Sequence, residues 1–184
     1  RRKPKRQPYG GYGIFIIFIF KSLLSLKNMQ FEINHSINSI SEADWDILNT
    51  SDFPFVRYAF LSALESSGAI SERTGWQAHH LVVKDKNSIV AVMPSYLKQH
   101  SYGEYVFDFQ WAEAYQRSGI EYYPKLISAI PFSPVTGPRL LLNSDYNESD
   151  ILDFIADELR NVITKANYSS WHSLFLTKEQ SDLF

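Results

Sequence analysis

The segment that most constrains the fold is NESDILDFIADELRNVITKA, residues 147–166, which has the pattern of an amphipathic helix. Asn147 suits the N-cap, and Asp150 lies three positions later, where an acidic side chain favours the first turn. Apolar residues recur along one face: Ile151, Ile155, Leu159, Val162 and Ala166. A helix of this length with one apolar face has to pack against another layer of structure.

The remaining segments supply that layer, mainly as strands. Residues 78–85 and 88–99 flank the polar turn KNS and predict a hairpin. EYVFDF, residues 104–109, predicts a third strand of the same meander. Other strands are expected at 29–37, 125–135, 137–142 and 169–176, and other helices at 39–49, 52–68 and 111–119. This order argues for an α+β or α/β domain. We expect the α+β class, with helices flanking a mixed, largely antiparallel sheet.

Charge divides the chain into two parts. Residues 1–28 hold seven Lys and Arg and no acidic residue, whereas residues 29–184 hold the other 11 basic and all 20 acidic residues, a net charge of −9. Because binding to phosphates needs basic side chains, we expect no nucleic-acid partner. The chain has no cysteine, which excludes a thiol nucleophile and cysteine-ligated metal. This is compatible with a reducing compartment, and we expect a cytoplasmic protein.

Residues 1–28 place a basic stretch before the apolar run Ile14–Phe20, as in a signal peptide. The run has seven residues, too few to span a bilayer as a helix, so we expect no stable membrane span. Met29 is the first methionine, and an ordinary globular pattern begins there. We therefore expect residues 1–28 to lie outside the fold and residues 29–184 to form one domain.

Several long segments resemble one family of proteins: FVRYAFLSALESSG, TGWQAHHLVV, PSYLKQHSYGEYVFDFQWAEAY, YYPKLISAIPFSPVTGPRLL and WHSLFL. From about residue 40 onward the chain is similar to the bacterial FemAB-like family, labelled peptidoglycan biosynthesis/recognition, whose members are predicted N-acyltransferases of the GNAT superfamily. The resemblance implies a GNAT-like fold and two such domains in tandem. The chain would then be the N-terminal half, truncated before a second domain, and activity of this half alone is not implied.

The activity that the resemblance implies is transfer of an acyl or aminoacyl group to an amine, with acyl-CoA as one possible donor and no metal. The alternative is a non-catalytic half that recognises a cell-wall or amine-bearing ligand. GNAT enzymes usually carry a [Gln/Arg]-x-x-Gly-x-[Gly/Ala] loop that holds a pyrophosphate at a helix N-terminus. The nearest match, QRSGIE at 116–121, ends in an acidic residue and follows a predicted helix, so we reject it.

Two acidic residues are the candidate catalytic groups. On the expected strand 104–109, Glu104 and Asp108 share one face while Tyr105 and Phe107 share the other. One carboxylate would act as a general base or as an anchor for a substrate amine. The alternative is a solvent-exposed acidic face with the two rings in the core.

The candidate substrate-binding residues surround this segment: His100, Tyr102, Tyr105, Trp111, Tyr123 and Arg139. Aromatic side chains here either line a pocket for an acyl chain or sugar or belong to the core. Arg139 follows the rigid stretch PFSPVTGP, which either faces a ligand or simply crosses between strands. His79 and His80 are neighbours on an expected strand and point to opposite faces, which disfavours a shared metal ion.

Overall fold

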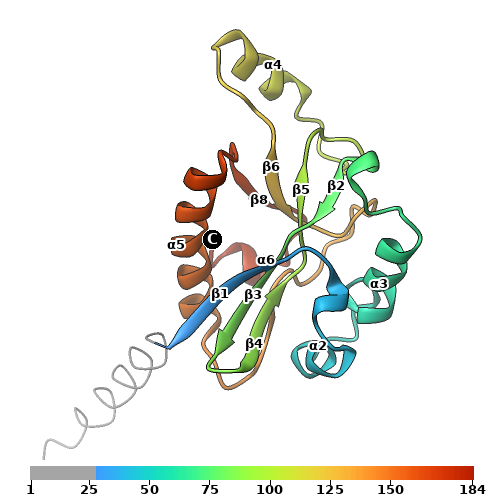
Figure 1. Ribbon diagram of the computed structural model, residues 1–184, viewed down its shortest axis with the longest axis vertical. Coiled ribbons are helices and arrows are strands. Elements are labelled where there is room, and N and C mark those ends of the chain that lie inside the picture. The colour runs from blue at the N-terminus through green and yellow to red at the C-terminus, as the bar shows by residue number, and fades with distance from the viewer. Residues whose placement is uncertain (1–27) are drawn as a thin grey trace, which may run out of the picture.

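The computed structural model describes residues 28–184 (Figure 1). Residues 1–28 were predicted to lie outside the fold. Apart from Asn28, these residues are not among those that the structure describes. Within 28–184, no helix is both long enough and apolar enough to cross a bilayer. The cytoplasmic location and the second domain after residue 184 stay predictions.

Two four-stranded sheets form the centre of the domain (Figure 1). The first has the order β1-β3-β4-β7 and is antiparallel throughout. Its strands are β1 (Met29–Asn34), β3 (His80–Asp85), β4 (Ser88–Met93) and β7 (Leu141–Leu142). The second has the order β2-β5-β6-β8, and only its last pair is parallel. Its strands are β2 (Trp76–Ala78), β5 (Ser95–Lys98), β6 (Lys125–Ser128) and β8 (Trp171–Ser173).

One long hairpin joins the two sheets. The predicted strands 78–85 and 88–99 both exist, but each is divided between the two sheets. The first is interrupted at His79 and the second at Pro94. Proline has no N–H to donate to a strand ladder, which accounts for the break at Pro94. The His79 N–H still donates to the Ser95 carbonyl at 2.8 Å, so the two arms stay paired across the bend.

The helices of the described residues are α2 (Glu42–Leu48), α3 (Tyr58–Ser66), α4 (Phe109–Arg117), α5 (Glu148–Ala166) and α6 (Lys178–Ser181), with 3-10 turns at Ile37–Ser39, Pro54–Val56 and Glu72–Thr74. Of these, α5 covers one face of the first sheet, and α2 and α3 cover the other. The predicted N-cap of α5 is confirmed, because Asn147 accepts a hydrogen bond from the Asp150 N–H. Ser41 caps α2 in the same way, accepting from the Asp44 N–H. The α+β class is therefore confirmed for the described residues.

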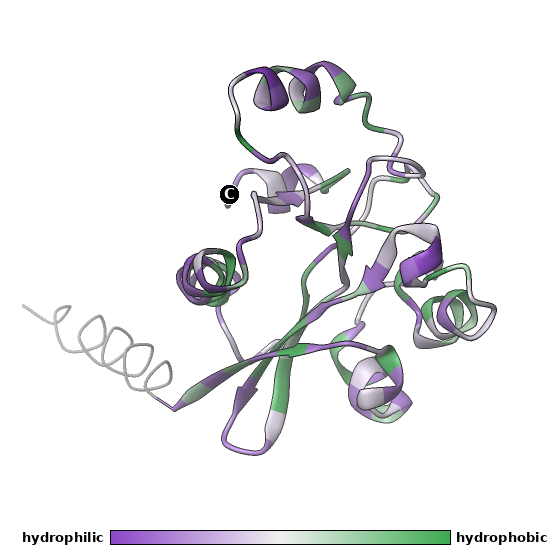
Figure 2. Cartoon of the chain, turned by 45° about the horizontal axis from the view of Figure 1, so that its top comes forward, coloured by the Kyte–Doolittle hydropathy of each residue, from purple (hydrophilic) through white to green (hydrophobic). Residues whose placement is uncertain are grey.

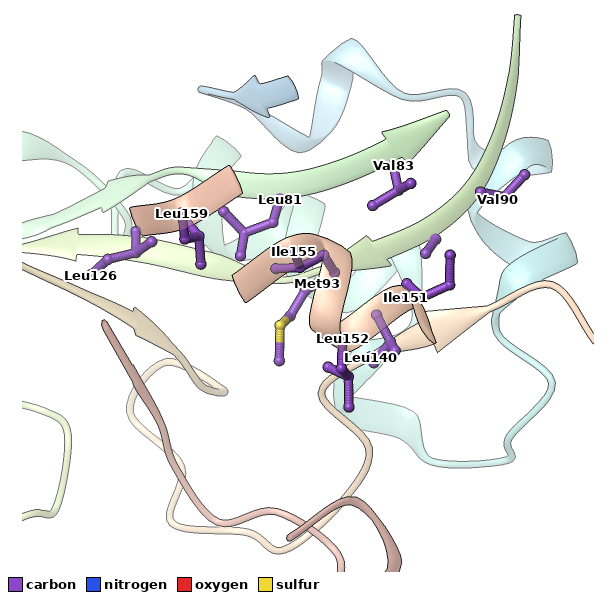
Figure 3. Close-up of a cluster of buried hydrophobic side chains, with 11 residues drawn as sticks. Leu81, Val83, Val90, Met93, Leu126, Leu140, Ile151, Leu152, Ile155 and Leu159 are labelled. Carbon is purple, nitrogen blue, oxygen red and sulfur yellow. The ribbon is translucent and has the colours of Figure 1, made fainter. Parts of the chain in front are cut away.

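The alternation of side chains along β3 produces a core on each face of the sheet. Leu81 and Val83 pack with Ile155 and its neighbours on α5 (Figure 3). Val82, between them, packs on the other side with Trp45 of α2. All three β3 side chains are fully buried. The sheet is thus a central layer between α5 and the α2–α3 pair, as Figure 1 shows.

The predicted third strand at 104–109 is wrong. Residues 102–108 form an irregular loop, and α4 begins at Phe109. The backbone turns twice with positive φ, at Gly103 (80°) and at Tyr105 (59°), which no extended strand allows. Tyr105 and Phe107 are 54% and 85% exposed rather than in the core. Glu104 and Asp108 point inward instead, because buried lysines lie there.

The segment after this loop stands apart from the sheets. Figure 1 shows α4 at the far end of the molecule, and Figure 2 shows its mixture of polar and apolar residues. None of the residues of α4 is buried. The predicted helix 111–119 is confirmed in position, and Gly119 follows it with a φ of 70°.

Replacing Ile155 by Ala tests the packing of α5 on the sheet. Because the side chain is fully buried among Leu81, Met93 and their neighbours, we expect the free energy of unfolding to fall by about 2–5 kcal/mol. Urea unfolding followed by circular dichroism measures it. Asp153→Ala, an exposed change on the same helix, should stay within ~0.5 kcal/mol. A loss below ~1 kcal/mol for Ile155→Ala would contradict this packing.

Candidate functional site

Two lysines lie side by side in the second sheet. Lys98 of β5 is directly opposite Lys125 of β6 in the antiparallel register. Residues opposite each other share a face of the sheet, and like charges in that arrangement repel. Both lysines are almost completely buried, with 0% and 1% exposure. Such a pair needs acidic partners, because an isolated buried charge is very costly.

Glu104 and Asp108 supply those partners from the loop after β5. The Lys125 Nζ lies 2.8 Å from Glu104 Oε2 and 2.6 Å from Asp108 Oδ2. Both carboxylates are buried, at 3% and 5% exposure. We call Lys98, Glu104, Asp108 and Lys125 the buried charge cluster. It explains why the acidic residues turn inward, and it excludes the solvent-exposed acidic face considered from the sequence.

Hydroxyl groups extend the cluster toward the surface. The Tyr122 hydroxyl donates to Asp108 Oδ2 at 2.8 Å, and the Lys125 Nζ donates to Ser101 Oγ at 2.9 Å. Ser101 Oγ is in turn 2.8 Å from the Tyr123 hydroxyl. A continuous hydrogen-bonded chain therefore connects the two tyrosines through the buried lysine.

The two carboxylates differ in their environment. Burial raises the pKa of Glu104, although Lys125 and Lys98 act in the other direction. Burial also acts to raise the pKa of Asp108, but the hydrogen bonds from Lys125, Ser101 and Tyr122 and the charge of Lys125 together outweigh it, and the pKa is lowered. Oxygens on both groups are buried without a hydrogen-bond partner: Glu104 Oε1 and Asp108 Oδ1, while Glu104 Oε2 has only its ion pair with Lys125. Buried oxygens without a hydrogen-bond donor are unusual in folded proteins and call for an explanation.

Lys98 has the most perturbed amino group of the cluster. Its Nζ lies 3.8 Å from the centre of a Trp76 ring and donates to the Tyr102 carbonyl at 3.1 Å. Burial lowers the pKa of Lys98 to about 7, against the opposing effect of the Glu104 charge. At neutral pH this amine can therefore both give and take a proton, as general acid–base groups do.

A cavity of about 410 Å³ adjoins the tyrosines. It is lined by Phe109, Ala112, Glu113, Gln116, Gly119, Ile120, Glu121, Tyr122 and Tyr123. We call it the tyrosine cavity. Glu113 already pairs with Arg117 at 2.5 Å, whereas Glu121 has no such partner within 28–184. The cavity thus combines aromatic rings with a free carboxylate, and both attract cations.

Comparison with known families assigns the chain to one of them. Residues 36–184 match the model of the FemAB-like family, which is described as peptidoglycan biosynthesis/recognition. The chain belongs to this family. The resemblance expected from about residue 40 onward is confirmed, and the FemAB-like assignment connects the chain with peptidoglycan biosynthesis or recognition. The searches of curated proteins and of solved structures gave no match. Membership of the GNAT superfamily stays a prediction.

The FemAB-like chain brings some of the predicted site residues together. Glu104 and Asp108 pair with Lys125, and Tyr123 is linked to the same lysine through Ser101. His100 and Tyr102 lie beside them: their rings are 5.0 Å apart, and His100 Nδ1 accepts a hydrogen bond from the Tyr102 N–H at 3.3 Å. The carbonyl of Tyr102 binds Lys98 directly, so this residue contributes to the cluster through its main chain.

Tyr105 and Trp111 are exposed on the same protruding segment, at 54% and 66%, outside the cluster and outside the lining of the tyrosine cavity. Their predicted binding role therefore rests on their exposed rings alone.

Arg139 does not join the cluster. It is fully buried, and its guanidinium donates to four main-chain carbonyls, those of Val135, Gly137, Pro138 and Leu174. Burial lowers its pKa to about 10. These contacts tie the rigid stretch before β7 to the segment after β8. These hydrogen bonds give Arg139 a part in the fold, and its predicted role in substrate binding stays a prediction.

The two lysines that complete the cluster and the hydrogen bond from Tyr122 to Asp108 were not predicted from the sequence. Lys98 and Lys125 stand in the apolar strands SYLK and KLIS, where a basic residue is unexpected. That pattern was the available signal for buried lysines. Ser101 and Tyr122 carried no comparable signal, since serine and tyrosine are common at the ends of strands and in loops.

Replacing Lys125 by Met tests the charge balance of the cluster. The change leaves Glu104 and Asp108 buried without their main partner, so we expect the free energy of unfolding at pH 7 to fall by about 3–5 kcal/mol. Thermal and urea unfolding measure it. Lys178→Met, at an exposed position, should change stability by less than ~0.5 kcal/mol.

A matched variant separates charge from packing. Adding Glu104→Gln and Asp108→Asn to Lys125→Met removes the uncompensated charges, and at least half of the lost stability should return. If Lys125→Met is no more harmful than Lys178→Met, the cluster does not contribute to the fold as described.

Proposed function

We propose that the domain takes part in the transfer of an acyl group to an amine, at the tyrosine cavity and the buried charge cluster beside it. The observation that carries the proposal is Glu104, a fully buried carboxylate with a raised pKa and an unpartnered oxygen, inside a member of the FemAB-like family. A general base works best when its pKa approaches the working pH, and burial moves Glu104 in that direction.

In this proposal Glu104 removes the proton of the reacting amine. The amine nitrogen attacks the acyl carbonyl, the new C–N bond forms, and the bond from the carbonyl carbon to the leaving thiolate or alkoxide breaks. The proton reaches Glu104 by a relay: Lys125 gives one of its protons to Glu104 Oε2, 2.8 Å away, and takes one back from Ser101 Oγ, which is replenished from the amine through the Tyr123 hydroxyl. Asp108 is a poorer base, because its pKa is lowered. It positions Lys125 and Tyr122 instead.

The tyrosine cavity is the proposed place for the amine. Glu121 and the rings of Tyr122 and Tyr123 would hold an ammonium group before it loses its proton. The exposed rings of Tyr102, Tyr105 and Trp111 would contact the remainder of the substrates. Acyl-CoA stays the proposed donor. Residues 116–121 would not hold its pyrophosphate, because this stretch ends α4 rather than beginning a helix.

One observation favours a second function, the recognition of a ligand without chemistry. The protruding segment exposes several large rings in one stretch of chain: Tyr102, Tyr105, Phe107, Phe109, Trp111 and Tyr115. Exposed aromatic groups are typical of binding surfaces, and the charge cluster would then serve only to hold the loop in place.

Substituting Glu104 separates the two functions. The full-length protein is incubated with acyl-CoA and a panel of primary amines, and release of the free thiol is followed. Glu104→Gln keeps the shape but removes the base, so we expect kcat to fall about 10²-fold or more with little change in KM. Glu179→Gln, at an exposed position of α6, is the control.

Melting curves must show that both variants are folded at the assay temperature. A Glu104→Gln rate within twofold of the control would remove Glu104 from the mechanism. If no preparation transfers acyl groups, but amines raise the melting temperature of the unaltered protein, the recognition function is the correct one.

A further inference from the structure

A second cavity, of about 500 Å³, lies between three separate parts of the chain. Its walls come from the connection after β1, from the end of α3 with the turn after it, and from β2. The lining residues are His35, Ser36, Asn38, Glu65, Ser66, Ile70, Ser71, Glu72, Gln77, Ala78 and His79. We call it the histidine cavity. It shares no lining residue with the tyrosine cavity and is large enough for a small organic molecule.

Glu65 provides a fixed negative charge in this cavity. Its carboxylate accepts hydrogen bonds from Ser36 Oγ at 2.8 Å, from the Ile37 N–H at 3.0 Å and from His80 Nε2 at 2.9 Å. Burial acts to raise its pKa, but the contact with His80 and the other donors lower it. The side chain is therefore ionised at neutral pH, although nine-tenths of its surface is covered.

His80 helps to hold this carboxylate in place. Its Nδ1 accepts a hydrogen bond from the Ser95 N–H at 3.2 Å, so that nitrogen carries no proton. The proton is on Nε2, which donates to Glu65. The ring is fully buried. This arrangement holds the Glu65 carboxylate in place at the edge of the cavity.

His79 presents a free acceptor to the cavity. Its ring Nδ1 lies 3.3 Å from the Gln77 carbonyl, so Nδ1 is the donor and Nε2 carries a lone pair. The residue is 6% exposed and lines the cavity. Burial and the neighbouring His35, whose ring centre is 4.5 Å away, lower the pKa of His79, which favours its neutral form.

The lining selects one kind of ligand. Glu65 and Glu72 are acidic, His79 offers a lone pair, and the lining contains neither Lys nor Arg. An anion would be repelled. Within residues 28–184, no group of His, Asp and Glu has the arrangement needed to hold a metal ion. An organic ammonium ion, with several N–H donors and a positive charge, matches these acceptors.

We propose that the histidine cavity binds a small organic ammonium ion, held by Glu65 and Glu72 and by the free nitrogen of His79. This site goes beyond the proposed acyl transfer, since it uses none of the residues of that reaction. It gives the domain a second place at which an amine can bind.

The test uses 1,5-diaminopentane as the probe and 1,5-pentanediol, a neutral molecule of the same length, as its control. Both are titrated into the full chain at constant pH and ionic strength, and the ring signals of His79 and His35 are followed by NMR. We expect saturable shifts with the diamine and none with the diol. Glu72→Gln and Glu65→Gln should each weaken binding at least about threefold, because each removes one attractive charge. Glu179→Gln should leave it unchanged.

The proposal is overturned if the diamine gives no saturable shift, if the diol shifts the same signals equally, or if the affinity of Glu72→Gln equals that of Glu179→Gln. Glu72 is exposed and its side chain makes no hydrogen bond within 28–184, so its variant should fold even if Glu65→Gln does not. Because binding is measured without any transfer reaction, failure here leaves the proposed function of the tyrosine cavity intact, and the reverse also holds.

Discussion

The opposition of Lys98 and Lys125 on neighbouring strands is the interaction on which the site depends. The register of β5 and β6 places two positive charges together in the interior, and the fold tolerates them only with acidic partners. Glu104 and Asp108 pair with Lys125, while the Tyr102 carbonyl and the Trp76 ring contact Lys98. The loop between β5 and α4 carries the two carboxylates to Lys125 and turns twice with positive φ on the way.

The same constraint explains the surface of the protruding segment. With the carboxylates turned inward, the residues between and after them face outward, and Tyr105 and Phe107 become exposed. Tyr122 and Tyr123 lie just before β6. The Tyr122 hydroxyl bonds to Asp108, and the Tyr123 hydroxyl bonds to Ser101, which bonds to Lys125. The tyrosine cavity therefore lies between an exposed aromatic segment and a buried group of charges. This combination supports a site where a substrate binds on one side and a proton is taken up on the other.

Local signals predicted a large part of the fold, and long-range contacts account for the remainder. Capping and periodicity identified α5, and the polar turn identified the hairpin β3–β4, because these features are encoded within a few residues. The alternation in EYVFDF was misleading: the same period of two arises when a loop turns two carboxylates toward buried lysines. Asp108 meets a lysine 17 positions further along the chain, and no local pattern reveals that contact. The contacts of Arg139 could not be predicted for the same reason, since its partners are main-chain carbonyls, one of them 35 positions away.

The most direct test of this account is the titration of the lysine side chains in the folded protein, followed by the NMR signals of their terminal carbons and assigned with Lys98→Met and Lys125→Met. If Lys98 is buried beside a second lysine as described, it should titrate near pH 7, far below the ordinary value of 10.5. The exposed Lys178 is the internal reference. A midpoint for Lys98 close to that of Lys178 would show that the two lysines do not share a buried site, and would contradict the account.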